Sequence, residues 1–245
     1  MRRIIRVFAI LWISIASNFA SEPDFGKFDG TAVIIDLNTS AKTIYGTHAD
    51  ERVNPCSTFK ILNSMIALDS GAVRDENETL KWDGVVRRYP LWNQDHSMRS
   101  AISVSAVWFY QELARRVGSE RMARMVAQAH YGNADTSRTL TDFWLGGGSL
   151  LVSANEEAEF VRLWMHEELP FSTRAMRTVK EILILEKKSD FTFGGKTGSC
   201  GGIGWFVGFV EKGDDTKAFA FEIRGEGASG AEAKKIASEY YLEEH

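Results

Sequence analysis

The sequence predicts an α+β fold with α/β/α layers: one antiparallel sheet built from strands near both ends of the chain, with flanking helices. A helical lobe is expected as an insertion at about residues 72–170 of the 245. Runs rich in β-branched and aromatic residues occur at 31–45 and again after residue 190, whereas apolar residues recur at helical spacing between them. Strands at both ends with helices in the middle favour a single sheet assembled from the two termini.

The first twenty residues have the pattern of a secretory signal peptide. Three arginines within the first six residues precede an apolar segment at 7–15, and small residues follow it. This segment is too short for a membrane span, which needs about 20 apolar residues. We therefore expect cleavage after Ala16 or after Ala20, leaving one domain at 21–245 that is secreted, in a bacterial periplasm, with no stable membrane anchor.

Composition argues against two classes of partner. A formal net charge of -4 without a basic run argues against nucleic acid. The five histidines show no close spacing of metal ligands, so no metal centre is expected. His96 is therefore expected to have a structural role.

The first elements are expected to be a hairpin and a helix. Two β-rich runs at 31–37 and 42–45 are separated by a polar turn, which favours a hairpin. After Pro55, apolar residues at helical spacing begin near Ser57 and end before Gly71, a residue suited to a helix C-terminus. Ser57 would then lie at a helix N-terminus, where the positive end of the helix dipole favours an anion.

The middle of the chain predicts helices and the last quarter predicts strands. An irregular aromatic stretch at 80–99 is expected to be loop and short helix. Ser153 with Glu156 three residues later forms a capping box at the start of one helix. The other expected elements are helices at 103–118 and 119–129, strands at 190–195, 203–210 and 217–224, and a final helix at 231–244.

Ser57 and Lys60 form the first candidate site. Residues three apart on a helix lie on one face, so the Lys60 amine can sit beside the Ser57 hydroxyl. With a lowered pKa, that amine can take the proton of the hydroxyl and activate it as a nucleophile. The alternative is coincidence, because a chain of this composition contains about one Ser-x-x-Lys by chance.

Two further motifs could belong to the same site. Lys196, Thr197 and Gly198, expected between two strands, could offer an anionic substrate a cation, a hydroxyl and an unobstructed backbone. The alternative is a strand that ends at a turn. Ser105, two residues before Val107, could relay a proton, and is otherwise a helix cap.

In their order along the chain, these motifs resemble those of the penicillin-recognising serine enzymes, and most closely those of the class D β-lactamases, or oxacillinases. The resemblance covers nearly the whole chain after residue 28. It rests on segments 55–61, 94–96, 105–107, 131–133, 142–145 leading to 153–154, 196–198 and 204–208. Any one of these motifs is weak, but their combined order is specific.

The resemblance implies a reaction and its residues. It makes Ser57 the nucleophile that attacks a β-lactam carbonyl, with the backbone N–H groups of Ser57 and Ser199 as the oxyanion hole. It makes Lys60 an N6-carboxylysine that acts as the general base, held by the Trp144 indole N–H. Burial among apolar side chains is consistent with this, because carboxylation requires a neutral amine. The proton relay to the ring nitrogen falls to Ser105.

The same resemblance implies the substrate and what the reaction needs. Lys196 and Thr197 help to bind the substrate carboxylate, in a site that Val107, Gly198 and Ser199 also line. The implied partner is a β-lactam, and CO2 or bicarbonate is needed to carboxylate the lysine, with no other cofactor and no metal.

At the substrate carboxylate the chain departs from the family. Many members carry an arginine late in the chain that grips this group, and residues 227–231 contain none. Arg224 and Lys234 are candidates, neither of which the sequence assigns.

Cys56 and Cys200 flank the two main motifs. If both motifs line one site, the thiols can be within bridging distance, and each is otherwise a small buried hydrophobe. A bridge in a similar place occurs in some class A enzymes that hydrolyse carbapenems, which suggests a role in the rigidity of the site.

Other members of the superfamily remain as alternatives. A D,D-peptidase and a β-lactam sensor domain would also be acylated at Ser57, but they would stay acylated. The peptidase would not need Trp144 beside its base, and sensors are normally tethered to membrane-spanning segments, which are not expected here. The sequence leaves open the range of β-lactams accepted and whether the protein is a monomer or a homodimer.

Overall fold

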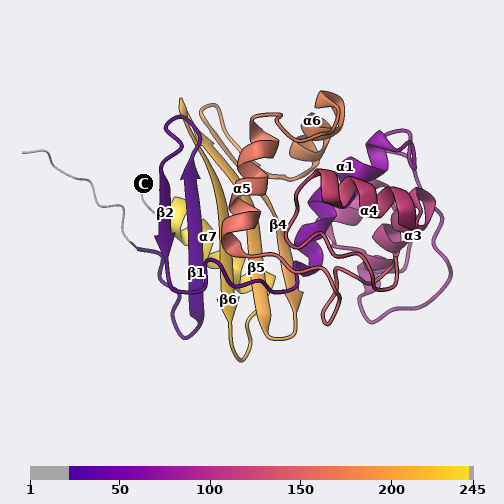
Figure 1. Ribbon diagram of the computed structural model, residues 1–245, viewed down its shortest axis with the longest axis horizontal. Helices are drawn as coiled ribbons and strands as arrows, with labels where there is room; N and C mark the ends of the chain where they lie inside the picture. The colour runs from indigo at the N-terminus through magenta and orange to yellow at the C-terminus, as the bar shows by residue number, and fades with distance from the viewer. Residues whose placement is uncertain (1–21, 243–245) are drawn as a thin grey trace, which may run out of the picture.

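The computed structural model describes residues 22–242 and contains one six-stranded sheet (Figure 1). Every neighbouring pair of strands is antiparallel, in the order β2-β1-β6-β5-β4-β3. The strands are β1 (Asp29–Asp36), β2 (Lys42–Tyr45), β3 (Ile184–Lys187), β4 (Phe191–Cys200), β5 (Ile203–Lys212) and β6 (Asp215–Arg224). Both ends of the chain thus contribute to one sheet, as predicted, and the expected signal peptide lies outside the described residues.

Helices cover both faces of the sheet and extend beyond one of its edges. In Figure 1, α5 lies across one face and α7 behind the other, while α1, α3 and α4 gather beside β4. The α-helices are α1 (Lys60–Asp69), α2 (Met98–Ser103), α3 (Val107–Val117), α4 (Ser119–Gln128), α5 (Ala154–Met165), α6 (Thr173–Ile182) and α7 (Gly230–Leu242). Two short 3-10 helices, η1 (Cys56–Phe59) and η2 (Pro90–Trp92), complete the set. This arrangement confirms the predicted α+β class.

The two faces of the sheet have separate cores. Successive residues of a strand point to opposite faces, so Phe219, Phe221 and Ile223 of β6 pack under α7, in what we call the α7-facing core. Ala218 and Ala220 of the same strand join the larger lobe-facing core, which also includes α1, α3 and α5. Ser57, Lys60 and Trp144, described below, lie on the lobe side, whereas Ser199 of β4 contacts the first residue of α7.

Several predicted elements were placed correctly. The hairpin of β1 and β2 forms, with Ala32 opposite Tyr45. Ser153 accepts a hydrogen bond from the backbone N–H of Glu156, and the Glu156 side chain returns one to Ser153, so the predicted capping box is confirmed.

Three predictions were wrong. Residues 196–198 lie within β4 rather than between two strands, because β4 and β5 stay paired to the Cys200–Ile203 turn. The helix expected at 103–118 begins only at Val107, as α3, since Ser105, between the end of α2 at Ser103 and α3, adopts a φ of 57° that a helix cannot contain. The structure also contains α6 and β3, which the sequence pattern did not predict.

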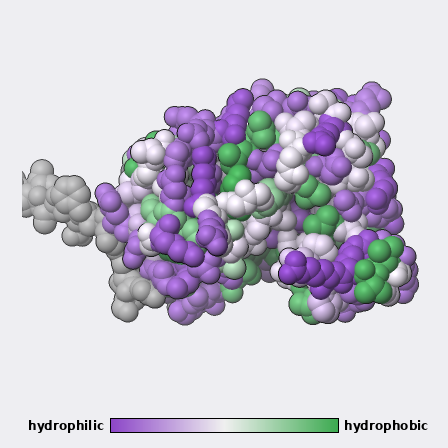
Figure 2. Space-filling view, turned by 90° about the horizontal axis from the view of Figure 1, so that it is seen from below, coloured by the Kyte–Doolittle hydropathy of each residue, from purple (hydrophilic) through white to green (hydrophobic). Residues whose placement is uncertain are grey.

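The surface carries one exposed hydrophobic loop. Figure 2 shows hydrophobic side chains at the surface of the end of the molecule formed by the helical lobe. Four of the exposed large hydrophobic residues lie between α1 and α2: Val85, Val86, Tyr89 and Leu91. Within residues 22–242, no helix is both long and apolar enough to span a bilayer.

Candidate active site

Ser57 and Lys60 meet at the junction of η1 and α1. The chain enters η1 at Cys56 with a φ of 53°, a left-handed conformation that is rare for residues other than glycine and costs free energy. The Lys60 Nζ lies 2.7 Å from the Ser57 Oγ. Ser57 is half-buried and reachable from solvent, whereas Lys60 is fully buried. The predicted pair is therefore in hydrogen-bonding contact, with only the hydroxyl accessible.

Burial favours the neutral form of the Lys60 amine. Transfer of an ammonium out of water is costly, and this desolvation, together with the nearby charge of Lys196, holds the pKa of Lys60 well below its usual value. The ring of Tyr110 lies beside the amine, with its centre 5.4 Å from Nζ. A neutral amine can accept a proton from a hydroxyl or react with an electrophile, which an ammonium cannot do.

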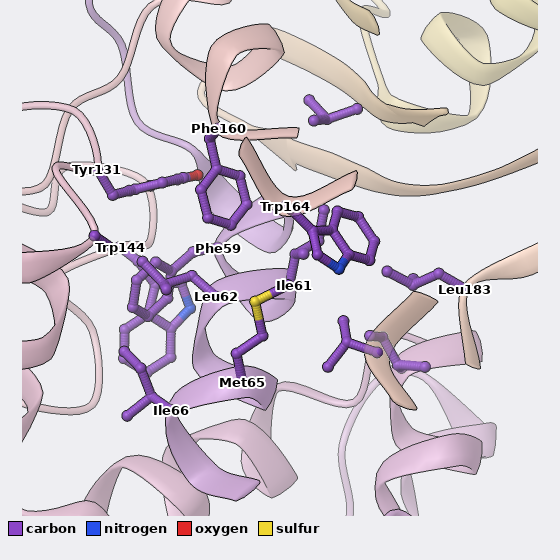
Figure 3. Packing of buried hydrophobic residues seen from close by; sticks show 14 of the residues in the cluster. Phe59, Ile61, Leu62, Met65, Ile66, Tyr131, Trp144, Phe160, Trp164 and Leu183 are labelled. Atoms are coloured by element: carbon purple, nitrogen blue, oxygen red, sulfur yellow. The ribbon is translucent and has the colours of Figure 1, made fainter. Parts of the chain in front are cut away.

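Trp144 lies close to this pair with an unused hydrogen-bond donor. Its ring is fully buried and stacks on Phe59, with ring centres 5.3 Å apart, and Figure 3 shows both beside Ile66 of α1. Among the described residues, the Trp144 Nε1 has no hydrogen-bond partner. Because a buried unpaired donor costs free energy, this atom is suited to a group that is not part of the polypeptide.

Asn54 joins the loop that follows Trp144 to the segment that carries Ser57. Its Nδ2 donates to the carbonyl oxygens of Gly148 and Leu150, at 3.0 and 2.9 Å, and its Oδ1 accepts from the backbone N–H of Gly147. Its own carbonyl oxygen accepts from the Trp205 indole N–H of β5. The nucleophile segment is thereby fixed to both the loop and the sheet.

Lys196 supplies a second buried amine on β4. Its Nζ donates to the carbonyl oxygen of Thr197 at 2.9 Å and to the Thr197 hydroxyl at 3.2 Å. Burial and the charge of Lys234 lower the pKa of Lys196 to about 7. This cation and hydroxyl form a binding point for an anionic group whose charge the lysine can match.

Gly198 allows the β4 motif to touch the nucleophile segment. A Cβ at this position would lie 2.8 Å from the Pro55 carbonyl oxygen and 3.2 Å from the Thr58 methyl group, so only glycine permits this approach. A Cβ at Gly230, the first residue of α7, would lie 2.7 Å from the Gly198 oxygen. Three segments distant in sequence thus converge here.

The disulfide reinforces the same junction. Cys56 and Cys200 are bonded, with their Cα atoms 6.0 Å apart and a sequence separation of 144. The bridge links the residue before Ser57 to the end of β4. Ser199, next to it, is exposed, and its Oγ accepts a hydrogen bond of 2.7 Å from the backbone N–H of Gly230.

Ser105 lies at the turn between α2 and α3, two residues before the half-buried Val107. Its left-handed conformation resembles that of Cys56, and such strained positions occur frequently at functional sites. The following helix packs on α1, because the Asn63 Nδ2 donates to the Tyr110 carbonyl oxygen and the Ser64 and Tyr110 hydroxyls share a hydrogen bond of 2.9 Å.

The two cations proposed for a substrate carboxylate differ in availability. Arg224 pairs with two carboxylates, because its Nε donates to Glu222 at 2.5 Å and its Nη1 donates to Glu51. Its buried Nη2 has no hydrogen-bond partner among the described residues. Lys234 of α7 is partly exposed and lies near enough to Lys196 to lower its pKa.

Two further polar residues, His96 and Glu157, are buried and hydrogen-bonded within the protein. His96 is buried and hydrogen-bonded to Ser100 and to the Leu91 carbonyl oxygen. The fully buried Glu157 of α5 contacts both Thr58 and Tyr131, and it is not among the site residues predicted from the sequence. Its position three, four and seven residues before the apolar side chains of α5 places it on their buried face, a signal that the helical spacing contained.

Comparisons with known proteins agree with this geometry. Residues 30–242 match the family model described as the penicillin binding protein transpeptidase domain. A relative named "Probable beta-lactamase YbxI", from Bacillus subtilis strain 168, is 39% identical over 219 residues, which are 88% of this chain and 80% of the relative. Among solved structures, "Structure of BPu1 beta-lactamase" has a TM-score of 0.88 and 40% identity, over 92% of this chain and 97% of its own. "Class D beta-lactamase BAT-2" has a TM-score of 0.85 and 38% identity, over 89% and 92%.

Proposed function

The chain belongs to the class D β-lactamases, serine hydrolases within the penicillin-binding transpeptidase family, and on that premise we propose that it opens the β-lactam ring through an acyl-enzyme on Ser57. The observation that carries this proposal is the 2.7 Å contact between the Ser57 Oγ and the Lys60 amine, whose pKa burial lowers well below its usual value. The resulting activity would give its host resistance to penicillin-type antibiotics.

In acylation, side chains of the protein transfer protons while the acyl group moves to Ser57. The Ser57 Oγ loses its proton toward the Lys60 side chain and attacks the lactam carbonyl carbon. The oxyanion that forms is stabilised by the backbone N–H groups of Ser57 and Ser199. The C–N bond then breaks, and Ser105 gives its proton to the departing ring nitrogen while it takes up the proton that the Lys60 side chain received from Ser57. Water hydrolyses the ester in the second half of the reaction, and Ser57 recovers its proton.

The surroundings of Lys60 fit a carboxylated lysine. Carboxylation by CO2, supplied by bicarbonate, needs the neutral amine that burial favours. The Trp144 Nε1 is an unpaired buried donor next to this region, suited to hold an added carboxylate oxygen. When present, this carboxylate supplies the general base for both halves of the reaction.

The substrate carboxylate is assigned to Lys196, Thr197 and Lys234. The Thr197 hydroxyl and the Lys196 amine already form one polar pair, and the charge of Lys234 acts on that amine. An anionic substrate would relieve the repulsion between the two lysines. Lys234 thus takes the place of the late arginine that the chain lacks, while Val107 and Gly198 line the remainder of the site.

Export to an oxidising compartment is part of the same proposal. The disulfide between Cys56 and Cys200 would persist in a periplasm and would be reduced in a cytosol. The signal-like segment at 1–20 has the pattern that directs such export.

Turnover of a chromogenic cephalosporin, measured with and without added bicarbonate, tests the proposal. We expect repeated turnover that rises with bicarbonate in the wild type, and no turnover for Ser57→Ala. A single round of acylation that bicarbonate does not affect would instead indicate a protein that stays acylated, such as a sensor or a D,D-peptidase.

A further inference from the structure

Glu157 is a buried carboxyl group to which the proposed reaction assigns no role. It lies in the first turn of α5, is fully buried, and shares one of its oxygens with two hydroxyl groups. The Thr58 Oγ1 lies 2.5 Å from the Glu157 Oε1, and the Tyr131 hydroxyl donates to the same oxygen at 2.7 Å. The other carboxyl oxygen, Oε2, has no partner among residues 22–242.

Thr58 connects this carboxyl group to the nucleophile. It is the residue after Ser57, inside η1, and its Oγ1 also lies 2.8 Å from the carbonyl oxygen of Pro55. The same carbonyl and the Thr58 methyl group are the atoms that pack against Gly198 of β4. A change at the Thr58 hydroxyl therefore reaches the backbone that positions Ser57.

Counting hydrogens shows that the Glu157 proton decides where Thr58 donates. The Thr58 hydroxyl has one hydrogen, and the Pro55 carbonyl oxygen can only accept. When Glu157 is neutral, its own proton can bridge to the Thr58 Oγ1, and Thr58 donates to Pro55. When Glu157 is ionised, only Thr58 can supply the hydrogen for the 2.5 Å contact, and Pro55 loses that bond.

The surroundings of Glu157 allow both its neutral and its ionised form to be populated near neutral pH. Burial raises the pKa of Glu157 to about 7, against the opposing effect of the hydrogen bonds from Thr58 and Tyr131. The neighbouring Glu156 also raises this pKa, although Glu156 is itself paired with Arg52. The facing Tyr131 stays neutral, because burial and the Glu157 charge raise its own pKa well above the usual value.

We propose that Glu157 is a positioning residue for the nucleophile and that its neutral form is the active one. Ionisation moves the Thr58 hydrogen bond from Pro55, at the start of η1, to α5, and so loosens the backbone that carries Ser57. It also places a buried negative charge against Thr58, the residue after Ser57, and this charge opposes the formation of an oxyanion at the Ser57 backbone N–H. Both effects slow acylation as the pH rises. This inference rests on the β-lactamase activity proposed above.

A pH profile of Glu157→Gln tests the inference. We would measure kcat/KM for a chromogenic cephalosporin from pH 5.5 to 8.5 at saturating bicarbonate, with Glu159→Gln as the matched control. Glu159 lies two residues further along α5, where it pairs with Arg162 instead of contacting the nucleophile segment. The ratio of kcat/KM between Glu157→Gln and the wild type should rise about tenfold from pH 6 to pH 8, since the wild type loses its neutral form over that range.

Titration of Lys196 affects both proteins alike, so the ratio isolates the effect of Glu157. In Glu159→Gln the ratio to the wild type should stay constant with pH. Tyr131→Phe provides a second variant: without the Tyr131 donor, the carboxylate is less stable, and the alkaline fall in kcat/KM should move to higher pH.

Parallel pH profiles for Glu157→Gln and the wild type would overturn the inference, as would an alkaline fall that Tyr131→Phe leaves in place. A uniform loss of activity at every pH would show that Glu157 only supports the packing of α5. If no protein in the series turns over the cephalosporin, the proposed function fails instead, so the two failures are distinguishable.

Discussion

The two faces of the six-stranded sheet bury different kinds of side chain. The α7-facing core consists of phenylalanines and aliphatic side chains, in which Phe219 packs against Phe193 and Phe206 with ring centres 5.7 and 5.4 Å away. The lobe-facing side contains Lys60, Glu157 and other buried polar groups within its apolar core. The α7-facing core is mainly apolar, although the buried Tyr241 hydroxyl beside it has no partner among the described residues, whereas the lobe-facing core holds buried ionisable side chains.

This difference shows how burial is used in the site. On the lobe side, desolvation shifts the pKa of Lys60 downward and that of Glu157 upward, so burial favours the neutral form of both groups. The Trp144 indole N–H remains unpaired in the same region. Perturbed and unsatisfied groups of this kind cluster at functional sites, because the chemistry uses the reactivity that burial creates.

The largest expected effect is the loss of Lys60. Lys60→Ala should lower kcat by about a thousandfold, because it removes the group that receives the Ser57 proton and activates water. Mass spectrometry of the intact protein after mixing with a penicillin should show slow formation of an acyl adduct that then persists. Lys180→Ala, at a surface lysine that pairs with Glu211, serves as the control and should turn over normally. Unimpaired hydrolysis by Lys60→Ala would contradict the assignment of the base.

On the opposite face, truncation should affect stability and leave chemistry intact. Phe219→Ala removes a fully buried ring and should lower the free energy of unfolding by about 3–5 kcal/mol. Urea titration would measure this loss, with Tyr89→Ala at a largely exposed ring as the control, where the change should be small. At a temperature where the variant is folded, its kcat/KM should match that of the wild type. A large fall in kcat/KM there would show that the α7-facing core also supports catalysis.

Glu157 should make the stability of the lobe side depend on pH. Below pH 4.5 the carboxyl group is protonated in both states and has no effect. Above it, only the unfolded chain releases the proton until the pH passes about 7, so stability falls across this window. The full cost is about 3 kcal/mol. Glu157→Gln removes it, so its stability relative to the wild type should be greater at pH 8 than at pH 5 in urea titrations. An equal difference at both pH values would show that Glu157 does not hold its proton in the folded state.

The smallest expected effect concerns substrate binding. Lys234→Ala should raise KM for a penicillin about tenfold with little change in kcat, because it removes one of the cations assigned to the substrate carboxylate, equivalent to about 1.4 kcal/mol. Lys235→Ala, at an exposed position one residue along α7, is the control and should leave KM unchanged. Equal KM values for the two variants would remove Lys234 from the site.

Local sequence patterns were enough to predict much of the fold. The hairpin at β1 and β2, the cap of α5 at Ser153 and the helix at α4 all follow from spacing and short-range chemistry. The break between α2 and α3 does not, because Ser105 adopts a left-handed conformation for which serine has no strong local preference. The extent of β4 likewise depends on its pairing with β5, which the local pattern around residues 196–198 does not reveal.

The site was predictable as a set of residues and not as an assembly. The order of the motifs identified Ser57, Lys60 and Lys196 without showing that Gly198 lets β4 touch the nucleophile segment. Arg224 was a candidate by its position in the sequence, and only the structure shows that it pairs with Glu222 and Glu51. The role of a buried group depends on partners that are distant along the chain, and a single sequence does not contain those pairings.

The central claim is that the lobe-facing core keeps Lys60 neutral for carboxylation. The most direct measurement is a carbon-13 NMR spectrum of the protein equilibrated with carbon-13 bicarbonate. We predict one protein-bound carbamate signal in the wild type that disappears in Lys60→Ala and on acidification, as the amine becomes protonated. A wild-type spectrum without this signal, or a signal that persists in Lys60→Ala, would contradict the claim.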